Sequence, residues 1–534
     1  MKRNVVLMRR IAAFAALVLT VGCGQTGGGA GQSSGGSGPG SGGRKATGGT
    51  AGSGSGGSQT SSGGEPGNSG SGGATGSGGG GAGGAPDNQG GSAGSGEPDA
   101  APGSDGQDTA PAIDTGGTPG TGPETYVATL LSKGTGQRTD RRPIPVGLFD
   151  ASVNKTFVTW MGPGSDALVR AYDHTTKTWS ADKIAGKATF ADKHNYPAMI
   201  KGKDGRLYIF YGCHNSPLRM TVSPAPGTID GTWSDGTVAI APDASYPAPI
   251  VTSDGTIYVF IRLTRLTNGY ADDRPFAMIK STDNGKTWTK QMVIDTFPRT
   301  DNLTEIYNGK ISYQPAVGAT KAKIHLSWTL AGGGPGKHEH DAFTRNVYYA
   351  YIDPTNDHLY NIDGKDLGTT VDDKEGEGDC KAIDTGCSNC DHQASYQVSV
   401  HYNDDGKPLI VFGHSKNGLT AVRNDAGKWV STVITPTVTE PRDINKVGPT
   451  SFQAFRGSGN TCVVHRSSDS GATWQQETII TAPHPVGRCH VIDHYTPDVK
   501  IFMEQNPDAS GGDTSTAKVT AGFVPPYEPG TSTK

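Results

Sequence analysis

The stretch STDNGKTW, Ser281–Trp288, recurs as SSDSGATW at Ser467–Trp474, and this pair of octapeptides is the strongest indication of the fold. In both copies an Asp and a Gly stand two residues apart, which is a turn composition, and a Trp follows. Around them lie short segments of alternating polar and apolar residues that turn at Asp-Gly, as in 198–210, 249–260 and 396–412. This pattern is typical of β-hairpins, and no stretch has sustained helical periodicity. The sequence therefore predicts an all-β fold.

Each octapeptide resembles the Asp box of BNR-repeat proteins, in which Asp and Gly form the turn between two blade strands and the Trp packs between sheets. A unit of roughly 45–60 residues is what a four-stranded propeller blade requires, and about 400 residues then give about seven blades. We predict a seven-bladed β-propeller over residues 124–526, with a β-sandwich or a β-helix as the alternatives. Asp boxes define architecture and do not identify chemistry.

The first 123 residues differ in composition from the rest. Residues 1–23 contain basic residues, then an apolar run from Ile11 to Val21, and then Cys23. They predict a lipoprotein-type signal peptide with lipidation at Cys23, and an ordinary cleaved signal peptide is the alternative. Residues 24–112 contain no Val, Ile, Leu, Met, Phe, Tyr or Trp, so residues 24–123 are predicted to be a disordered Gly/Ser-rich tether. We expect an exported outer-membrane lipoprotein, at the cell surface or in the periplasm.

The charge distribution limits the possible partners. The formal net charge is -4 at pH 7, and no cluster of Lys and Arg is present, which argues against a nucleic-acid partner. The apolar run near the N-terminus is short for a membrane span, so a lipid anchor is the only membrane contact expected. We expect the chain to be a monomer.

Two histidines, His194 and His214, flank the predicted hairpin 198–210. A hairpin of that size brings both imidazoles to the same end of one sheet. In the next hairpin, Tyr246 is expected to take the place of His194, and Arg262 that of His214. Two neighbouring blades would then present all four side chains at one mouth of the propeller.

The residue types in this set favour β-elimination from a uronic acid. Glycoside hydrolysis normally uses two carboxylates, and no such pair stands near these positions; a sialidase needs three arginines, and only Arg262 is well placed. In β-elimination, a cation such as Arg262 neutralises the carboxylate beside the acidic C5 proton. A base must take that proton and an acid must protonate the departing O4, for which His194 and Tyr246 are suited. A non-catalytic carbohydrate-binding propeller and a sialidase-type glycoside hydrolase are the alternatives.

Three segments resemble the propeller-type polysaccharide lyases that cleave ulvan: HNYPAM (194–199), YGCHNSPLR (211–219) and SYPAP (245–249). The position of Arg262, sixteen residues after Tyr246, and the segment 345–351 add to the resemblance, which covers most of residues 140–520.

The resemblance implies that His194 and Tyr246 form the acid/base pair, and that Arg262 and His214 hold and neutralise the uronate carboxylate. Tyr307, which opens a further blade, would assist them. The implied substrate is an acidic polysaccharide, ulvan first. Which of His194 and Tyr246 takes the proton stays open.

The cysteines divide into separate groups. Cys462 and Cys489 lie in the last blades and are candidates for a disulfide, whereas Cys213 has the setting of a small buried strand residue. The remaining cluster has metal-ligand spacing and comprises Cys380, Cys387, Cys390 and His392, with His340 further upstream.

Three thiolates and one imidazole would make a closed structural zinc site, which would pin the strand-poor loop 363–391. The resemblance also implies a structural metal here. His340 and His392 are alternatives for the nitrogen ligand, and one disulfide with a spare thiol is the alternative to zinc.

Overall fold

The computed structural model describes residues 124–127, 129–133, 142–267, 270–296, 304–332, 343–372, 376–385, 394, 396–437, 443–482, 485–496, 499–504 and 518–522. These residues are almost entirely β-strands and turns. The two exceptions among them are a 3-10 turn, η1 (Pro163–Ser165), and a π-helical turn, η2 (Gly376–Cys380). The predicted all-β class is confirmed. The signal peptide, Cys23 and the tether lie outside the described residues and stay predictions.

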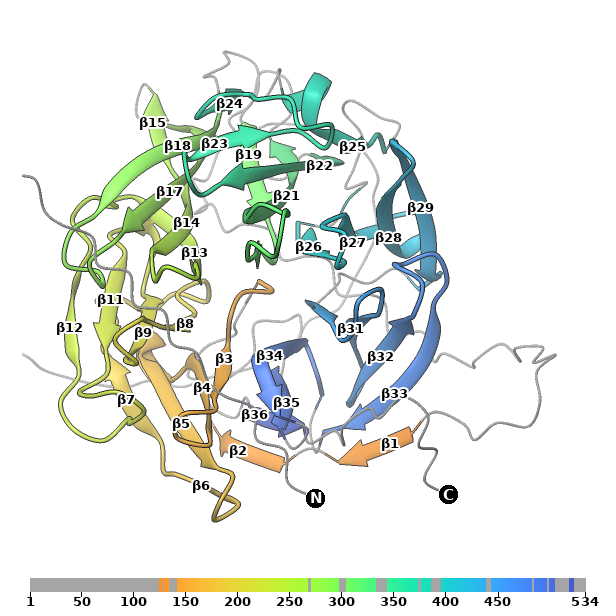
Figure 1. Cartoon of the computed structure of the whole chain (residues 1–534). Coiled ribbons are helices and arrows are strands. Elements are labelled where there is room, and N and C mark those ends of the chain that lie inside the picture. The colour runs from red at the N-terminus through yellow and green to blue at the C-terminus, as the bar shows by residue number, and fades with distance from the viewer. Residues whose placement is uncertain are drawn as a thin grey trace, which may run out of the picture. The chain divides into compact units, whose positions relative to one another are not determined.

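The strands form six hydrogen-bonded sheets arranged as a propeller (Figure 1). Five of the sheets form one blade each. The first contains β8 (Ala198–Lys201), β9 (Leu207–Tyr211), β11 (Arg219–Val222) and β12 (Ser234–Thr237). The second contains β10 (His214–Ser216), β13 (Ala244–Val251), β14 (Ile257–Leu263), β17 (Phe276–Ser281), β18 (Thr289–Asp295) and β24 (Val371–Asp372). The third contains β15 (Arg265–Thr267), β16 (Tyr270–Arg274), β19 (Thr304–Asn308), β20 (Ser312–Gln314), β21 (Lys323–Gly332), β22 (Phe343–Asp353), β23 (His358–Tyr360) and β25 (Lys381–Ile383).

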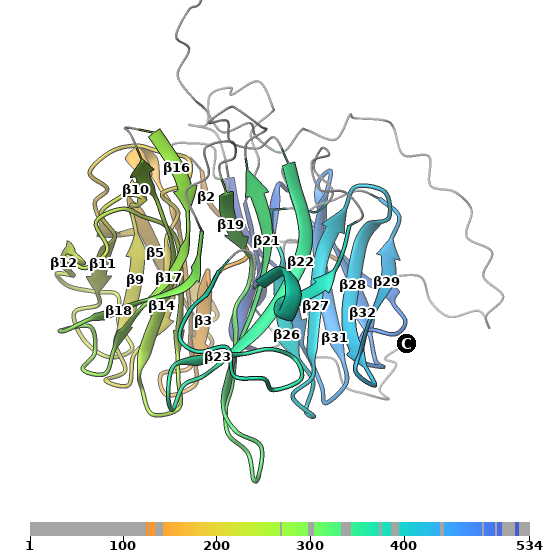
Figure 2. The same ribbon diagram turned by 90° about the horizontal axis from the view of Figure 1, so that it is seen from above.

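The last two of these five sheets follow in the second half of the chain. One contains β26 (Ser399–Tyr402), β27 (Pro408–His414), β28 (Gly418–Asp425) and β29 (Lys428–Thr435). The other contains β1 (Glu124–Val127), β30 (Asp443–Lys446), β31 (Phe452–Ser458), β32 (Thr461–Ser467) and β33 (Gln475–Thr481). Figure 2, turned by 90°, shows their strands running between the two faces of the propeller.

The sixth sheet has nine strands and joins the two ends of the described chain. It contains β2 (Thr129–Lys133), β36 (Lys518–Gly522), β35 (Val499–Glu504), β34 (Arg488–Thr496), β3 (Gly147–Asp150), β4 (Lys155–Met161), β5 (Ala167–Asp173), β6 (Thr178–Trp179) and β7 (Lys183–Gly186). β1 pairs in parallel with β33, and β2 pairs antiparallel with β36, so N-terminal strands complete C-terminal sheets. Figure 1 shows the orange strands β1 and β2 beside the blue C-terminal ones. This pairing closes the propeller and leaves few exposed strand edges.

The inner strands of the sheets form a ring about the central axis. Around it, β3 contacts β8, β8 contacts β13, and β13 contacts β20; from there the contacts continue through β26 and β30 to β34, which pairs with β3. The apolar core lies between neighbouring sheets. Leu409 and Val411 of β27, for example, pack in one cluster with Phe452 and Ala454 of β31.

Both Asp boxes form the predicted turns. The Asp283 carboxylate accepts hydrogen bonds from the Ser281 hydroxyl at 2.8 Å and from the Thr287 hydroxyl at 2.6 Å, and Asp469 repeats both contacts at the same distances. These turns join β17 to β18 and β32 to β33. Trp474 packs against an apolar cluster between its own sheet and the preceding one, as the resemblance implied.

Three further predictions concern the cysteines and the loop 363–391. Cys462 of β32 and Cys489 of β34 form a disulfide, and Cys213 is buried, so both expectations are confirmed. The loop is more ordered than its composition suggested: β24 pairs with the edge of β18, and β25 pairs with β22. Within the described residues, no helix is long and apolar enough to cross a membrane.

Candidate active site

The structure brings the two predicted histidines together at the start of the inner strands. His194 lies in the turn before β8, and His214 opens β10. Their ring centroids are 4.0 Å apart, with 37° between the ring planes. The ring of Tyr246, near the start of β13, lies 5.9 Å from that of His194 and 5.7 Å from that of His214. Tyr307 of β19 follows, 6.2 Å from Tyr246.

Asp192, which sequence reasoning missed, links the two imidazoles. Its Oδ1 lies 2.7 Å from Nδ1 of His194, and its Oδ2 lies 3.0 Å from Nδ1 of His214. Burial would raise the pKa of Asp192, but its hydrogen bonds with the two histidines outweigh burial and hold that pKa well below its usual range. Its position two residues before His194 is the sequence signal that could have found it.

Irregular backbone positions these side chains. β10 pairs with β13 through a register shift between His214 and Ser216, and the residue between them, Asn215, has a φ of 52°. β13 has its own register shift before Ala248, where the buried Tyr246 has a φ of 57°. A left-handed conformation is costly for a tyrosine. Bulges of this kind change the direction of side chains near active sites. The two register shifts lie next to His214 and Tyr246, whose rings meet in one cluster.

The strand register corrects the predicted equivalence between the two hairpins. In each hairpin, the alanine of Tyr-Pro-Ala pairs with a phenylalanine of the next strand. Tyr196 is therefore the counterpart of Tyr246, and their rings stack with centroids 6.0 Å apart. The same register makes Gly212 the counterpart of Arg262. The prediction that Tyr246 takes the place of His194, and Arg262 that of His214, is therefore wrong. His194 lies two residues before Tyr196, the true counterpart of Tyr246, and His214 lies two residues after Gly212, the true counterpart of Arg262.

Two arginines lie against the tyrosine rings. Cζ of Arg262 is 4.5 Å from the ring centroid of Tyr246 and 4.8 Å from that of Tyr307. Arg142, which precedes β3, is 4.1 Å from the first centroid and 4.3 Å from the second. Its Nη1 donates to the carbonyl of Tyr396 at 3.2 Å. Burial would lower the pKa of Arg142, but its attraction to the neighbouring tyrosines, Tyr246 first, raises it. No sequence pattern singled out Arg142.

Arg262 is also part of a buried ion-pair network. Its side chain is fully buried, and its Nη1 lies 3.1 Å from Oε2 of Glu305. The same oxygen lies 3.2 Å from Nη1 of Arg274. The charge of Arg262 is therefore partly compensated by the Glu305 carboxylate of β19. Its guanidinium contacts the cluster at the rings of Tyr246 and Tyr307. Neither Glu305 nor Arg274 was among the predicted site residues.

The predicted zinc site lies mostly outside the described residues. His340, Cys387, Cys390 and His392 fall there, while Cys380 is buried and burial raises its pKa to about 12. Zinc at this cluster stays a prediction. Within the described ranges, one group of metal-ligating residue types has its ligand atoms within 4.8 Å of one another: Asp192, His194 and His214. Because both Nδ1 atoms contact the carboxylate, we interpret this group as a hydrogen-bonded triad.

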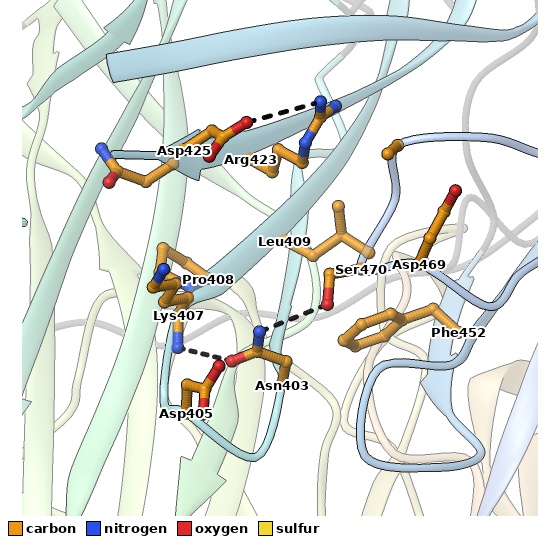
Figure 3. A pocket seen from close by; sticks show the side chains of 12 residues that line it. Asn403, Asp405, Lys407, Pro408, Leu409, Arg423, Asp425, Phe452, Asp469 and Ser470 are labelled. Carbon is orange, nitrogen blue, oxygen red and sulfur yellow. Dashed lines mark hydrogen bonds and ion pairs between the residues drawn. The ribbon is translucent and has the colours of Figure 1, made fainter. Parts of the chain in front are cut away.

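Two of the hollows in the described part of the chain lie near the second Asp box and on the central axis, away from this cluster. One, of about 250 Å³, adjoins the second Asp box, where Asn403 Nδ2 donates to the Ser470 hydroxyl at 3.3 Å (Figure 3). The other, of about 950 Å³, lies on the central axis toward the other ends of the inner strands. Within it, Lys310 lies between Asp443 and Asp493, at 3.2 and 3.5 Å. Neither hollow is lined by the predicted catalytic residues.

Comparison with known proteins agrees with this architecture. A protein-family profile described as "BNR repeat-containing family member" matches residues 155–437, more than half of the chain, and the protein belongs to this family. The chain is 25% identical over 330 residues to an "Ulvan lyase" of Alteromonas sp. (strain LOR), covering 54% of this chain and 64% of the relative. It is 23% identical over 327 residues to "Ulvan Lyase-PL25" of Pseudoalteromonas sp. (strain PLSV), with the same two coverages. The matches thus span slightly less than two thirds of each relative.

Solved structures show the same fold. A structure described as a new family of polysaccharide lyase, PL25-ulvanlyase, matches with a TM-score of 0.60 and 20% identity, over 74% of this chain and 96% of that one. The structure of the polysaccharide lyase Uly1 matches with a TM-score of 0.50 and 12% identity, over 77% of this chain and 94% of that one. The protein is therefore a BNR-repeat propeller that resembles ulvan lyases.

Proposed function

We propose that the protein is a polysaccharide lyase that cleaves a uronate-containing acidic polysaccharide by β-elimination, with ulvan as the first substrate to test. One observation carries the proposal: two imidazoles bridged by a carboxylate lie against a buried tyrosine that two guanidinium groups flank. The curated relatives named above support it. So does a structural match at 19% identity and a TM-score of 0.60, described as an ulvan lyase bound to -[GlcA(1-4)Rha3S]-.

The electrostatics of the cluster support a choice of acid and base. Arg142 and Arg262 bring positive charge to the Tyr246 ring, and cations stabilise a phenolate over a neutral phenol. Tyr246 therefore takes the C5 proton. The negative charge of Asp192 favours a protonated imidazole, so His194 donates the proton that the departing O4 requires.

The electron pair of the broken C5–H bond then forms the C4–C5 double bond as the C4–O4 bond breaks. Positive charge must meet the uronate carboxylate while this happens, because the C5 proton is otherwise too weakly acidic. Arg262 supplies that charge, with Arg142 as a second guanidinium, while His214 acts on the acid, His194, through their common Asp192 carboxylate. Tyr307 lies within reach of both arginines and assists in holding them.

A non-catalytic carbohydrate-binding propeller is the second candidate. The burial of the proposed acid and base favours it, because a substrate has little access to them. Tyr246 is only 2% exposed and His194 only 7%, so a substrate reaches them only at the edge of their rings or after a local opening.

The test is to incubate the full-length protein with a panel of uronate polysaccharides and follow the ultraviolet absorbance of the unsaturated product. Rising absorbance is the expected result. Binding without absorbance would favour the carbohydrate-binding propeller, and new reducing ends without absorbance would indicate hydrolysis.

We also infer that the propeller has seven blades. The nine-stranded sheet is held at its middle by one parallel bridge, Leu148 of β3 with Asp493 of β34. On one side of that bridge lie β34, β35, β36 and β2; on the other lie β3, β4, β5 and the two strands that pair with β5. Each half has the size of a blade, which with the five other sheets makes seven.

The remaining proposals concern segments outside the described residues. We propose a lipid anchor at Cys23, a disordered tether over residues 24–123, and a structural zinc ion held by Cys380, Cys387, Cys390 and one histidine. Metal analysis of the purified protein tests the last of these, and a zinc content far below one per chain would rule it out. Growing cells that produce the protein with a radioactive fatty acid tests the anchor, since a lipidated protein incorporates the label.

A further inference from the structure

The Asp192 carboxylate is fully engaged by the histidine pair. Oδ1 accepts the backbone N–H of His194 at 2.7 Å and also contacts Nδ1 of the same residue at 2.7 Å. Oδ2 contacts Nδ1 of His214 at 3.0 Å. The side chains of the two histidines are 8% and 13% exposed, and that of Asp192 is 25% exposed, so these contacts are partly shielded from water.

The chemistry of these contacts fixes the protons on both rings. The pKa of Asp192 is held far below its usual range, so the carboxylate is ionised at neutral pH and can only accept hydrogen bonds. Each Nδ1 must then carry a hydrogen. In its neutral form each imidazole has an unprotonated Nε2, and in its charged form it has an Nε2–H donor.

We propose that Asp192 is a positioning residue that holds His194 and His214 in the same Nδ1–H tautomer and makes them share a single extra proton. The proposal rests on the proposed function for its catalytic meaning, but the tautomers themselves can be observed without any substrate.

Charge explains why one proton is shared. Two imidazolium ions with ring centroids 4.0 Å apart repel each other, and one carboxylate compensates only one of them. The guanidinium groups of Arg142 and Arg262, 4.1 and 4.5 Å from the Tyr246 ring centroid, oppose a second positive charge as well. The pair therefore holds one protonated and one neutral imidazole. The Nε2–H of the charged ring is a hydrogen-bond donor, and the Nε2 of the neutral ring is an acceptor.

The backbone of Asp192, as well as its carboxylate, anchors the loop. Its N–H donates to the Ser165 hydroxyl at 3.0 Å, and its carbonyl accepts from that hydroxyl at 3.1 Å and from the N–H of Asn195 at 3.1 Å. A change confined to the carboxylate leaves these contacts in place. Asp192→Asn therefore preserves the loop while it alters the hydrogen-bond chemistry.

In Asp192→Asn, the amide oxygen accepts from one ring, and the amide NH2 can only donate to the other. One imidazole must then change to the Nε2–H tautomer. The first measurement is nitrogen-15 NMR of the full-length chain with labelled histidines, assigned through His194→Gln and His214→Gln. We expect both Nδ1 atoms to be protonated in the wild type and one ring to change tautomer in Asp192→Asn. A neutral Nε2–H tautomer at either ring of the wild type would overturn the proposal without any variant.

The second measurement is the kinetics on the substrate that the absorbance assay identifies. In Asp192→Asn, we expect kcat to fall by about 10²-fold or more, with a displaced pH profile and a KM within about threefold of wild type. Asp166→Asn is the matched control: its carboxylate caps a nearby loop through the N–H of Ala188 at 2.9 Å, and it should leave the tautomers and kcat unchanged. A wild-type pH profile and kcat in Asp192→Asn would refute the positioning role. Absence of turnover on every substrate, with the expected tautomers, would refute the proposed function alone.

Discussion

Replacing Glu305 by glutamine is expected to destabilise the propeller strongly. Oε2 of Glu305 lies 3.1 Å from Nη1 of Arg262 and 3.2 Å from Nη1 of Arg274. The side chains of Glu305 and Arg262 are fully buried, and that of Arg274 is 5% exposed. Glutamine keeps the size of the side chain and one acceptor oxygen, but it removes the only charge of the residue. Two buried guanidinium ions then lose the carboxylate that compensates them.

The size of the effect follows from the burial of this network. Removing one partner of a buried ion pair costs about 3–5 kcal/mol, because the remaining charge stays out of water without its counter-charge. A propeller of about 400 residues unfolds with an entropy of about 0.8 kcal/mol per kelvin near its midpoint. The loss of about 3–5 kcal/mol therefore corresponds to a fall of about 4–6 °C in Tm.

Thermal unfolding followed by circular dichroism measures this shift. Asp230→Asn is the matched control, because Asp230 pairs with Lys183 at 3.0 Å but the two side chains are 76% and 44% exposed. An exposed pair contributes at most about 1 kcal/mol, so the control should lower Tm by about 1 °C or less. If Glu305→Gln unfolds within about 1 °C of the control, the two guanidinium ions do not depend on this carboxylate, and the reasoning fails.

Three further predictions follow from single residues. Tyr246→Phe should reduce turnover by at least about 10²-fold in the absorbance assay while the unfolding midpoint stays close to wild type, and full activity would remove this hydroxyl from the mechanism. Burial, and to a lesser extent the charge of Arg456, lowers the pKa of His465 from 6.5 to about 4. Between these pH values the unfolded chain protonates this imidazole and the folded protein does not, so the free energy of unfolding decreases as the pH falls from 6.5 toward 4. Urea unfolding should show that the wild type loses up to about 2 kcal/mol more than His465→Gln between pH 7 and 5, and equal losses would contradict this assignment. Gly471 and Gly427 have φ values of 86° and 81°, but a Cβ at Gly471 would be 2.4 Å from Leu409, whereas one at Gly427 meets nothing within 4 Å. Gly471→Ala should therefore lower Tm more than Gly427→Ala, and equal shifts would show that the contact relaxes without cost.

The all-β propeller class was predictable because its signals are local. The octapeptide at Ser281–Trp288 contains every group that its turn uses, from the Asp283 carboxylate to the Thr287 hydroxyl. The approach of His194 and His214 was predictable for the same reason, since one hairpin separates them. A disulfide between Cys462 and Cys489 could be proposed from their place in the chain, but only the geometry of β32 and β34 decided it.

The site residues that sequence reasoning missed depend on contacts between distant segments. Arg142 precedes the first inner strand, and the closure of the ring brings it to Tyr246, more than a hundred residues away. Glu305 meets Arg262 across two sheets, 43 residues apart in the chain. The mistaken equivalence of His194 and Tyr246 has a different cause: the Tyr-Pro-Ala sequence common to both hairpins sets their register and makes Tyr196 the counterpart of Tyr246, which the strand ends alone do not show.

The placement of carboxylates around the tyrosine cluster bears on the choice between elimination and hydrolysis. A glycoside hydrolase of the usual type needs two carboxyl groups that face the scissile bond. The two carboxylates that the structure shows in contact with the described cluster have other partners: Glu305 binds two buried arginines, and Asp192 binds both imidazoles. What faces the tyrosines is positive charge, from Arg142 and Arg262. A substrate that brings its own carboxylate, as a uronate does, compensates this charge, whereas a neutral sugar leaves it uncompensated. The acidic group that makes the C5 proton removable is thus also the group that the electrostatics of this cluster favour.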